Sequence, residues 1–195
     1  MTPSFYSFRK LIEQFVKLTD EEWELMVPHL SEKVIEKNDY MIREGQIGKE
    51  LGYVVQGDMR HFYTRDGEEK TTYFYFENAL VGPYISCITG QPSQLSIEAL
   101  TETRLLVFPY AAMKALYAQS HTWEKFGRVL AEYLAIGLEE RMVGLLMLSP
   151  EERYVQLLQS NKAKILERIP QHLIANYLGV TPVSLSRIRN RILKK

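Results

Sequence analysis

The sequence has a single cysteine, Cys87, among 195 residues. One thiol excludes an intramolecular disulfide, and it excludes a Cys-rich zinc or iron–sulfur site, because such sites need several thiolates. The four histidines are scattered along the chain rather than clustered. The sequence therefore predicts no metal site.

Motifs of catalysis are missing as well. The chain contains no GxSxG, HExxH, P-loop or GxGxxG pattern, so nothing in it argues for an enzyme. No stretch approaches the roughly 20 apolar residues of a membrane span, and the N-terminus has no apolar run of the signal-peptide kind. We therefore expect a cytoplasmic protein with no membrane partner.

Acidic residues are absent from the C-terminal end. The whole chain balances 24 basic against 24 acidic residues, but from Arg168 onward it has six Lys or Arg and no acid. The preceding 167 residues carry 18 basic and 24 acidic groups, a net charge of −6. A positive segment on a neutral protein indicates an anionic partner, although charge alone is weak evidence.

The chain divides into three stretches of different periodicity. Residues 4–30 show helical spacing, and residues 33–108 show short β-type runs broken by glycine. The clearest hairpin turns at Asp66-Gly67, between flanks rich in Thr, Tyr and Phe. The regular spacing of these strands predicts a closed or rolled antiparallel sheet.

A long helix is predicted over residues 122–147, which contain no proline. This helix carries two apolar faces, so it needs two partners. One partner is its own β-domain, and the other is the same helix of a second subunit, which gives a homodimer. The alternative is a helix buried within a monomer. The first face consists of Val129, Tyr133, Ile136, Val143 and Met147, and the second of Leu130, Leu134, Leu138 and Leu145.

A new helix is predicted after this one, because Ser149-Pro150-Glu151-Glu152 combines an N-cap, a proline at the first position and a capping box. The predicted domains are therefore an N-terminal domain at 1–118, the dimerisation helix at 119–148 and a C-terminal domain at 149–195.

The last stretch has the spacing of a helix-turn-helix over residues 171–190. Ala175 is the small residue where two helices touch, and Gly179 is the turn residue that can adopt positive φ. Thr181 is an N-cap for the second helix, with Pro182 just inside it. The apolar positions that lock the two helices together are filled by Ile174, Leu178, Val180, Leu185 and Ile188.

The outward face of the second helix is basic, with short polar groups near its N-terminal end, which favours entry into a major groove. We expect Arg187 to make a bidentate contact with guanine, while Arg189 and Arg191 hold phosphate. The alternative is a small-ligand sensor or protein-interaction module whose helical tail does not bind DNA specifically. The predicted DNA-binding residues are Thr181, Val183, Ser184, Ser186, Arg187, Asn190, Arg191 and Lys194.

The order of these parts resembles the Crp/Fnr superfamily of transcription regulators. SPEERYVQLL and IPQHLIANYLGVTPVSLSRIR are similar to the short members found in Bacteroidetes. The resemblance implies an α+β fold: an N-terminal antiparallel β-roll of the cyclic-nucleotide-binding type (a double-stranded β-helix), a long dimerisation helix and a C-terminal all-α helix-turn-helix domain that lacks a β-wing. It also implies DNA, and with it RNA polymerase, as partners.

The resemblance weakens at the effector site. Cyclic-AMP-binding members carry Gly-Glu-Leu and then an Arg-Ser or Arg-Thr pair, whose Arg pairs with the cyclic phosphate. Here Pro83 follows Gly82 at the acid position, and Ser93 and Gln94 stand at the Arg-Ser pair. A buried phosphate would lose its cationic partner, so we expect no response to cyclic AMP.

Other effectors of the superfamily also lack support, because one cysteine cannot hold an iron–sulfur cluster and the lone His61 is poor evidence for haem. We expect no cofactor. An uncharged or aromatic effector near Tyr84, Phe76 and Leu138, or an empty structural roll, remain open. The residues of the degenerate pocket are Gly82, Pro83, Tyr84, Ser93, Gln94, Leu138 and Glu139.

Overall fold

The computed structural model describes residues 2–159 and 163–192, which form two compact units. The first unit comprises the residues up to His61 together with Phe74–Leu134. The second comprises Phe62–Tyr73 and the residues from Ala135 onward. The long helix that was predicted to separate the domains therefore contributes to both units, and so does one β-hairpin.

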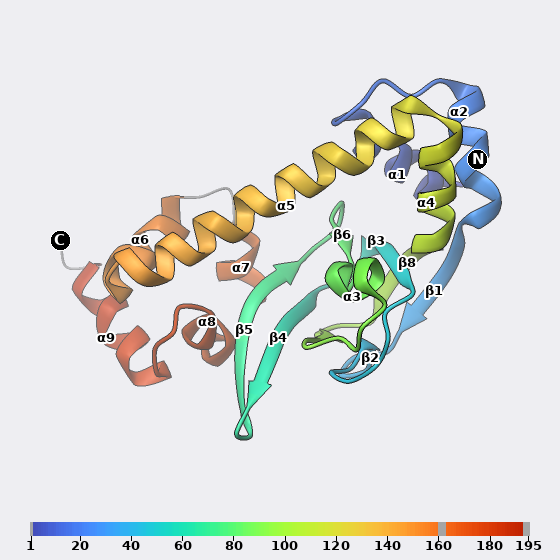
Figure 1. The fold of residues 1–195 in the computed structure, drawn as a ribbon. Coiled ribbons are helices and arrows are strands. Elements are labelled where there is room, and N and C mark those ends of the chain that lie inside the picture. The colour runs from blue at the N-terminus through green and yellow to red at the C-terminus, as the bar shows by residue number, and fades with distance from the viewer. Residues whose placement is uncertain (1, 160–162, 193–195) are drawn as a thin grey trace. The chain divides into compact units, whose positions relative to one another are not determined.

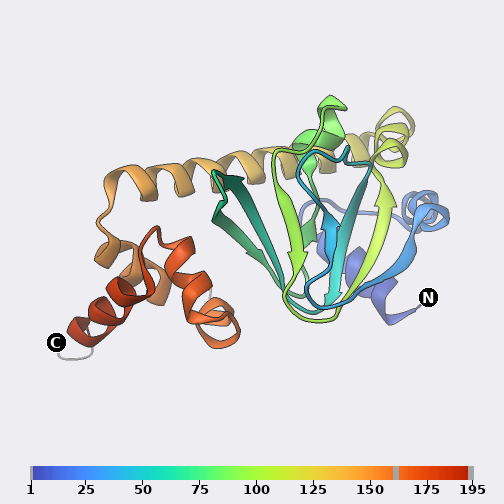
Figure 2. The ribbon, with the colours of Figure 1, turned by 90° about the horizontal axis from the view of Figure 1, so that it is seen from below.

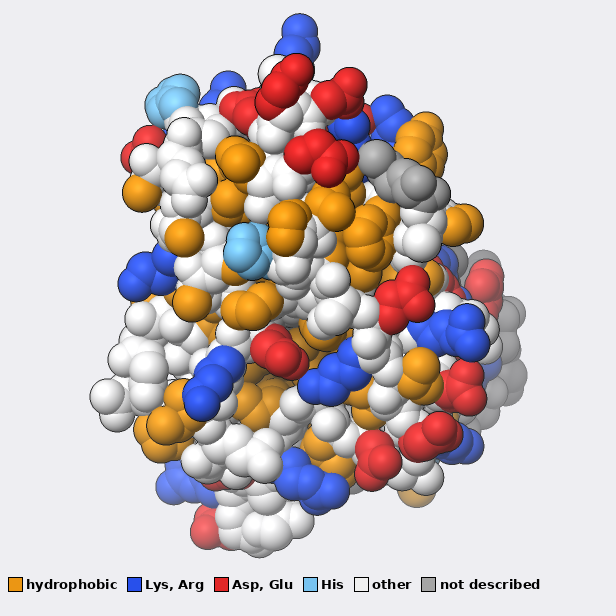
Figure 3. Space-filling view, turned by 90° about the vertical axis from the view of Figure 1, so that its right-hand side faces the viewer, with side chains coloured by type: hydrophobic (Ala, Val, Ile, Leu, Met, Phe, Trp, Pro, Cys, Tyr) orange, Lys and Arg blue, Asp and Glu red, His pale blue; other side chains and the backbone are white. Residues whose placement is uncertain are grey.

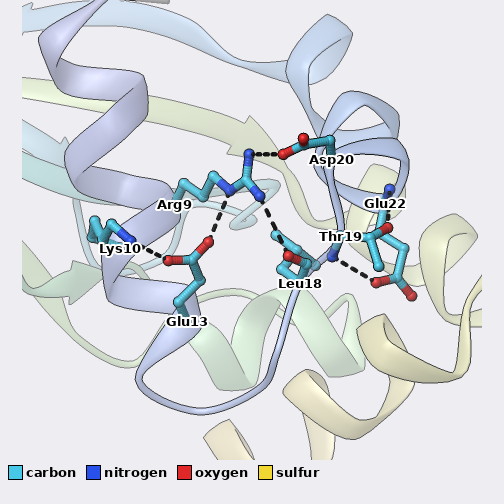
Figure 4. Close-up of polar contacts among 7 residues, drawn as sticks. All are labelled: Arg9, Lys10, Glu13, Leu18, Thr19, Asp20 and Glu22. Atoms are coloured by element: carbon cyan, nitrogen blue, oxygen red, sulfur yellow. Dashed lines mark hydrogen bonds and ion pairs between the residues drawn. The ribbon is translucent and has the colours of Figure 1, made fainter.

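Two helices and a short 3-10 turn precede the strands. They are α1 (Pro3–Glu13), α2 (Asp20–Met26) and η1 (Val27–His29). The predicted N-cap at Thr19 is confirmed: its hydroxyl accepts a hydrogen bond from the backbone N–H of Glu22 at 3.2 Å, and the Glu22 carboxylate accepts one from the Thr19 N–H at 3.1 Å. This reciprocal box fixes where α2 begins (Figure 4).

Arg9 joins α1 to the start of α2 (Figure 4). Its guanidinium donates to Glu13 within α1 at 2.9 Å, to the carbonyl of Leu18 at 3.3 Å, and pairs with Asp20 at 2.6 Å. The pairing raises the pKa of Arg9, chiefly through the hydrogen bond to Asp20. The loop between the two helices is thus held by one side chain.

The strands form two antiparallel sheets, in the orders β1-β8-β3-β6 and β2-β7-β4-β5 (Figures 1 and 2). The predicted antiparallel β-roll is confirmed. The strands are β1 (Ser31–Ile35), β2 (Tyr40–Ile42), β3 (Glu50–Gln56), β4 (Met59–Arg65), β5 (Glu68–Tyr75), β6 (Leu80–Val81), β7 (Ser96–Ala99) and β8 (Thr103–Pro109).

The predicted hairpin is formed by β4 and β5, with Asp66 and Gly67 at its turn. Both residues adopt positive φ, 54° and 79°. Two consecutive residues with positive φ are typical of a type I′ hairpin turn, whose twist matches that of the strands it joins. Asp followed by Gly is the residue pair that tolerates this conformation best.

Side chains from both sheets meet in one apolar cluster. This cluster combines β1, β3, β6 and β8 of one sheet with β2, β4 and β7 of the other. Its buried members are Ile35, Ile42, Val54, Met59, Val81, Ile97, Ala99, Leu105 and Val107. A second cluster packs the flanking helices against β3 and β8 around Phe8, whose ring stacks on Phe108 at 5.5 Å.

The remaining helices are α3 (Tyr84–Thr89) between β6 and β7, then α4 (Tyr110–Gln119), α5 (His121–Met147), α6 (Pro150–Gln159), α7 (Ala163–Arg168), α8 (Gln171–Tyr177) and α9 (Pro182–Ile192). From Tyr110 to Ile192 the described residues contain helices and no strand. Among the described residues no helix is long and apolar enough to cross a membrane.

Helix α5 changes character along its length. In its first half Trp123, Phe126 and Leu130 are buried in the second cluster. In its second half Ile136 is 58% exposed and Met147 is 76% exposed. The prediction that this helix has one apolar face against its own β-domain is confirmed for the first half, and the apolar face of the second half is uncovered.

The face of the molecule in Figure 3 shows acidic and basic side chains interspersed with apolar ones, with no large area of one sign. The excess of basic residues in the sequence lies from Arg168 onward, in the segment that contains α8 and α9.

Candidate functional site

Helices α8 and α9 form the predicted helix-turn-helix. Ala175 is completely buried, so the two helices approach closely where a larger side chain would separate them. Gly179 adopts φ +71°, the left-handed conformation that the turn requires. The locking positions are as predicted: Ile174, Leu178, Leu185 and Ile188 are buried, and Val180 is half-buried.

Thr181 starts α9. Its hydroxyl accepts a hydrogen bond from the backbone N–H of Ser184 at 3.1 Å and donates one to the Ser184 hydroxyl at 3.0 Å. An N-cap fixes the helix start and hence its rotation about its own axis. The Thr181 hydroxyl, predicted as a DNA contact, is therefore already engaged in the protein.

The outward face of α9 is open to solvent. Val183 is 61% exposed, and Ser186, Arg187 and Asn190 are exposed as well. Ser184 is half-buried because it takes part in the cap. Lys194, which was also predicted to touch DNA, lies outside the described residues.

The three arginines of α9 differ in what they bind. The Arg191 guanidinium holds the Glu151 carboxylate at 2.9 and 3.1 Å, and Arg189 donates to the side-chain oxygen of Gln171. Arg187, in contrast, makes no hydrogen bond or ion pair with the described residues. The planar guanidinium of arginine suits bidentate binding of paired acceptors, and on Arg187 it is exposed.

Two further arginines hold the C-terminal end of α8, and sequence reasoning missed both. Arg153 donates to the carbonyls of Leu178 at 3.0 Å and Leu148 at 2.6 Å. Arg141 of α5 donates to the carbonyl of Tyr177 and lies over its ring, 3.9 Å from the centroid. Burial lowers the pKa of Arg141. These donors satisfy carbonyls that a helix end leaves without intrahelical partners.

No short-range signal connects these arginines with α8, because Arg153 and Arg141 lie 25 and 36 positions from the α8 carbonyls that they bind. The only available signal is the general need of a helix C-terminus for donors, which does not say where the donors come from.

The effector residues of the first unit gather around the start of α3. Gly82 adopts φ +155°, and a Cβ there would lie 2.7 Å from Leu51 Cδ2, so only glycine fits. Pro83 is buried and has no N–H, which removes one of the donors that a helix start offers to an anion. Tyr84 packs edge-on against Tyr110 at 6.0 Å, and burial raises its pKa.

The polar residues predicted for this region are either hydrogen-bonded within the protein or exposed to solvent. The Ser93 side chain is buried, and its hydroxyl donates to the carbonyl of Leu95 at 2.8 Å. Gln94 is exposed. Leu138 and Glu139 are exposed residues of the second unit. The structure thus brings Gly82, Pro83 and Tyr84 together and gives Ser93 a partner within its own loop.

One buried ion pair in the β-roll was not predicted. Arg60 of β4 binds Glu98 of β7 at 2.6 Å, and the two side chains are 7% and 13% exposed. Because β4 and β7 are neighbouring strands far apart in the sequence, the pairing follows from the sheet order alone. A buried pair of this kind is costly to break from one side.

His61 of β4 is shielded from solvent, and its Nδ1 lies 3.2 Å from the Tyr75 hydroxyl. Burial lowers the pKa of His61 from its ordinary value of 6.5 to about 4. The unfolded chain therefore binds the proton more readily in this interval, and stability should fall as the pH drops from about 6.5 toward 4.

We expect the free energy of unfolding of His61→Gln to lose this decline at acid pH. At roughly 1.4 kcal/mol per pKa unit, the decline amounts to a few kcal/mol at most. Urea unfolding at pH 7 and pH 5 measures it. The exposed His29→Gln is the control and should keep the wild-type difference between the two pH values. An unchanged difference in His61→Gln would show that another group carries the acid sensitivity.

The sequence and the fold were compared with those of known proteins. Residues 32–120 match the family of the cyclic nucleotide-binding domain. The catabolite activator protein of Thermus thermophilus has a similar structure (TM-score 0.58, 25% identity, 92% of this chain and 86% of that one). FixK2 of Bradyrhizobium japonicum is also similar (TM-score 0.70, 18% identity, 85% of this chain and 85% of that one). No curated protein matches the sequence.

A structure described as a putative Crp/Fnr regulator from Eubacterium rectale is similar as well (TM-score 0.66, 20% identity, 90% of this chain and 84% of that one). Residues 32–120 are therefore a cyclic nucleotide-binding domain. Over 85–92% of its length the chain has the fold of the catabolite activator protein, FixK2 and the putative Crp/Fnr regulator.

Proposed function

We propose that the protein is a transcription regulator that binds DNA through α9. The main support for the proposal is Arg187, which has no partner among the described residues and lies on the exposed face of α9. The inner face of this helix is buried and its N-cap at Thr181 is formed. Val183 beside it can touch a thymine methyl, and Ser186 can reach a base or phosphate. Thr181 acts by fixing the start of α9, and Ser184 supports it.

Phosphate binding falls to the C-terminal part of α9. Asn190 and Arg191 are exposed there, and Lys194 follows in the sequence. Arg191 has to exchange Glu151 for a phosphate, and because this pair is largely exposed the exchange costs little.

The proposed active form is a homodimer through residues 122–147. The exposed apolar side chains of α5 are Tyr133, Ile136, Leu138, Met142, Val143, Leu145, Leu146 and Met147. So many on one helix form a larger apolar surface than a monomer usually exposes. A two-fold contact along α5 covers them and presents two α9 helices to half-sites about one helical turn apart on a pseudo-palindromic site.

Binding to a pool of duplex DNA as a function of salt tests this function. Neutralised phosphates release counterions, so log K should fall linearly with log salt concentration, with a slope of about −0.9 per phosphate contact. Fluorescence anisotropy between 50 and 200 mM salt measures the slope. A protein that binds no duplex at the low end of this range would refute the proposal.

We further propose that the effector, if one binds, is not cyclic AMP. Pro83 supplies neither carboxylate nor N–H, the Ser93 hydroxyl is engaged by Leu95, and Gln94 is exposed and uncharged. We expect no thermal stabilisation by millimolar cyclic AMP or cyclic GMP. A ligand at 100 times its Kd would stabilise the protein by about 2.7 kcal/mol, so a rise of several degrees would contradict this assignment.

A further inference from the structure

The side-chain amide of Asn176, near the C-terminal end of α8, binds the backbone of strand β5. Its Oδ1 accepts a hydrogen bond from the Thr71 N–H at 2.6 Å, and its Nδ2 donates one to the Glu69 carbonyl at 2.7 Å. All three residues belong to the second unit. A segment of the β-hairpin and the first helix of the helix-turn-helix are thus joined by two short hydrogen bonds.

The geometry of this contact follows from the place of β5 in its sheet. β5 is the last strand in the order β2-β7-β4-β5, so one of its edges has no neighbouring strand. In a strand, the carbonyl of one residue and the N–H of the residue two positions later point to the same side. The Asn176 amide offers one acceptor and one donor, as the peptide group of a neighbouring strand would.

The Thr71 side of the contact is shielded from water, while Asn176 and Glu69 are half-buried. Thr71 is 2% exposed, and its hydroxyl is buried without a hydrogen-bond partner among the described residues. The same end of α8 is held by Arg141 and Arg153 through the carbonyls of Tyr177 and Leu178. Loss of the Asn176 bonds would leave the N–H of the buried Thr71 without its partner, which costs free energy. The arrangement in which both bonds form is therefore favoured.

We propose that Asn176 is a latch that holds the helix-turn-helix on the hairpin and keeps it in a state of low DNA affinity. The proposal rests on the proposed DNA-binding function. Strands β4 and β5 run through both units, so a rearrangement of the β-roll can move the hairpin and open the latch. The latch thereby joins the end of the hairpin to α8 within the second unit.

The sign of the effect follows from position and charge. The first helix of a helix-turn-helix crosses the DNA backbone when the second lies in the groove. The hairpin segment docked on α8 carries three acids, Asp66, Glu68 and Glu69, against two bases, Arg65 and Lys70. A bulky segment with a net negative charge on this helix opposes the approach of phosphates.

Asn176→Asp tests the latch, because it keeps the size of the side chain but turns its donor into an acceptor that faces the Glu69 carbonyl. Asn176→Ala removes both bonds. Without DNA, we expect hydrogen exchange of the Thr71 amide to accelerate at least about tenfold in both variants. With DNA, we expect the affinity of Asn176→Ala to rise by about tenfold, within the usual range of coupling between sites. Asn176→Asp is used for the exchange measurement alone, because its new carboxylate would itself oppose phosphates. Asp66→Asn, an acid-to-amide exchange at the exposed turn of the same hairpin, should change the exchange rate of Thr71 by less than twofold.

The two readouts separate the possible failures. If the Thr71 amide exchanges at the wild-type rate in both Asn176 variants, the latch does not exist. If exchange accelerates while the DNA affinity of Asn176→Ala stays within twofold of wild type or falls, the contact is structural and the regulatory proposal is wrong. If the wild-type protein binds no DNA, the proposed function fails and the regulatory role fails with it, whereas the exchange data still decide whether the contact forms. Melting temperatures close to wild type show that the variants are folded.

Discussion

Val143→Glu should convert the protein from a dimer to a monomer. Val143 is 47% exposed on α5, within the apolar stripe that also contains Ile136 and Met147. In a two-fold contact through this stripe, each new carboxylate would be buried in a water-poor interface. An unpaired buried charge costs several kcal/mol, so the dimer dissociation constant should rise by at least about 100-fold.

Sedimentation velocity at micromolar concentration measures this change. Because Val143 is half exposed in the single chain, the monomer should keep its melting cooperativity and its helix content. Ala131→Glu is the matched control, since it adds the same charge to an exposed position of α5 outside the stripe. A Val143→Glu protein that remains a dimer, or an Ala131→Glu protein that dissociates equally, would show that the subunits do not associate through this face.

Arg187→Ala should remove most of the sequence preference in DNA binding. A bidentate contact from arginine to guanine is worth about 1–3 kcal/mol of discrimination. Each half-site is contacted by one Arg187, so the dimer should lose about 2–6 kcal/mol of discrimination between sequences. The ratio of specific to nonspecific affinity should therefore fall by more than tenfold. Competition between a selected duplex and random duplex measures this ratio.

Arg187→Lys separates charge from geometry. Lysine keeps the positive charge but lacks the planar fork, so nonspecific affinity should stay near wild type while the preference falls. Arg128→Ala changes an exposed α5 cation that pairs with Glu132 and should leave the preference intact. If Arg187→Ala lowered affinity for all sequences equally, Arg187 would be a phosphate contact and another residue would read the bases.

The helix-turn-helix could be predicted from sequence because its determinants are local. Ala175 and Gly179 lie four positions apart, and the Thr181 cap involves a residue three positions away. The hairpin turn at Asp66-Gly67 is equally local, because its two φ angles depend on the residues that adopt them. In each case a short spacing and a residue type determine the conformation.

The contacts that join distant segments could not be predicted. Asn176 binds backbone groups about a hundred positions away, and any surface asparagine would look the same in sequence. The Arg60–Glu98 pair depends on which strands become neighbours, 38 positions apart. Such partners are fixed by topology, which a periodic pattern of apolar residues does not specify.

The effector residues fall between these two cases. Gly82 was predicted from the Gly-Glu-Leu motif of the family that the chain resembles, and its left-handed backbone conformation gives the physical reason for a glycine there. Ser93 was predicted because it stands at the Arg-Ser pair of that family. Its hydroxyl donates to the Leu95 carbonyl two positions later, a local contact that the motif position does not reveal.

Selection of bound sequences from a random duplex pool tests the central claim most directly, because it makes no assumption about the target. The account predicts an enriched two-fold symmetric motif with half-sites about 10 base pairs apart, centre to centre, which Arg187→Ala fails to enrich. A pool that shows no enrichment, or an asymmetric motif that Arg187→Ala selects equally well, would contradict it.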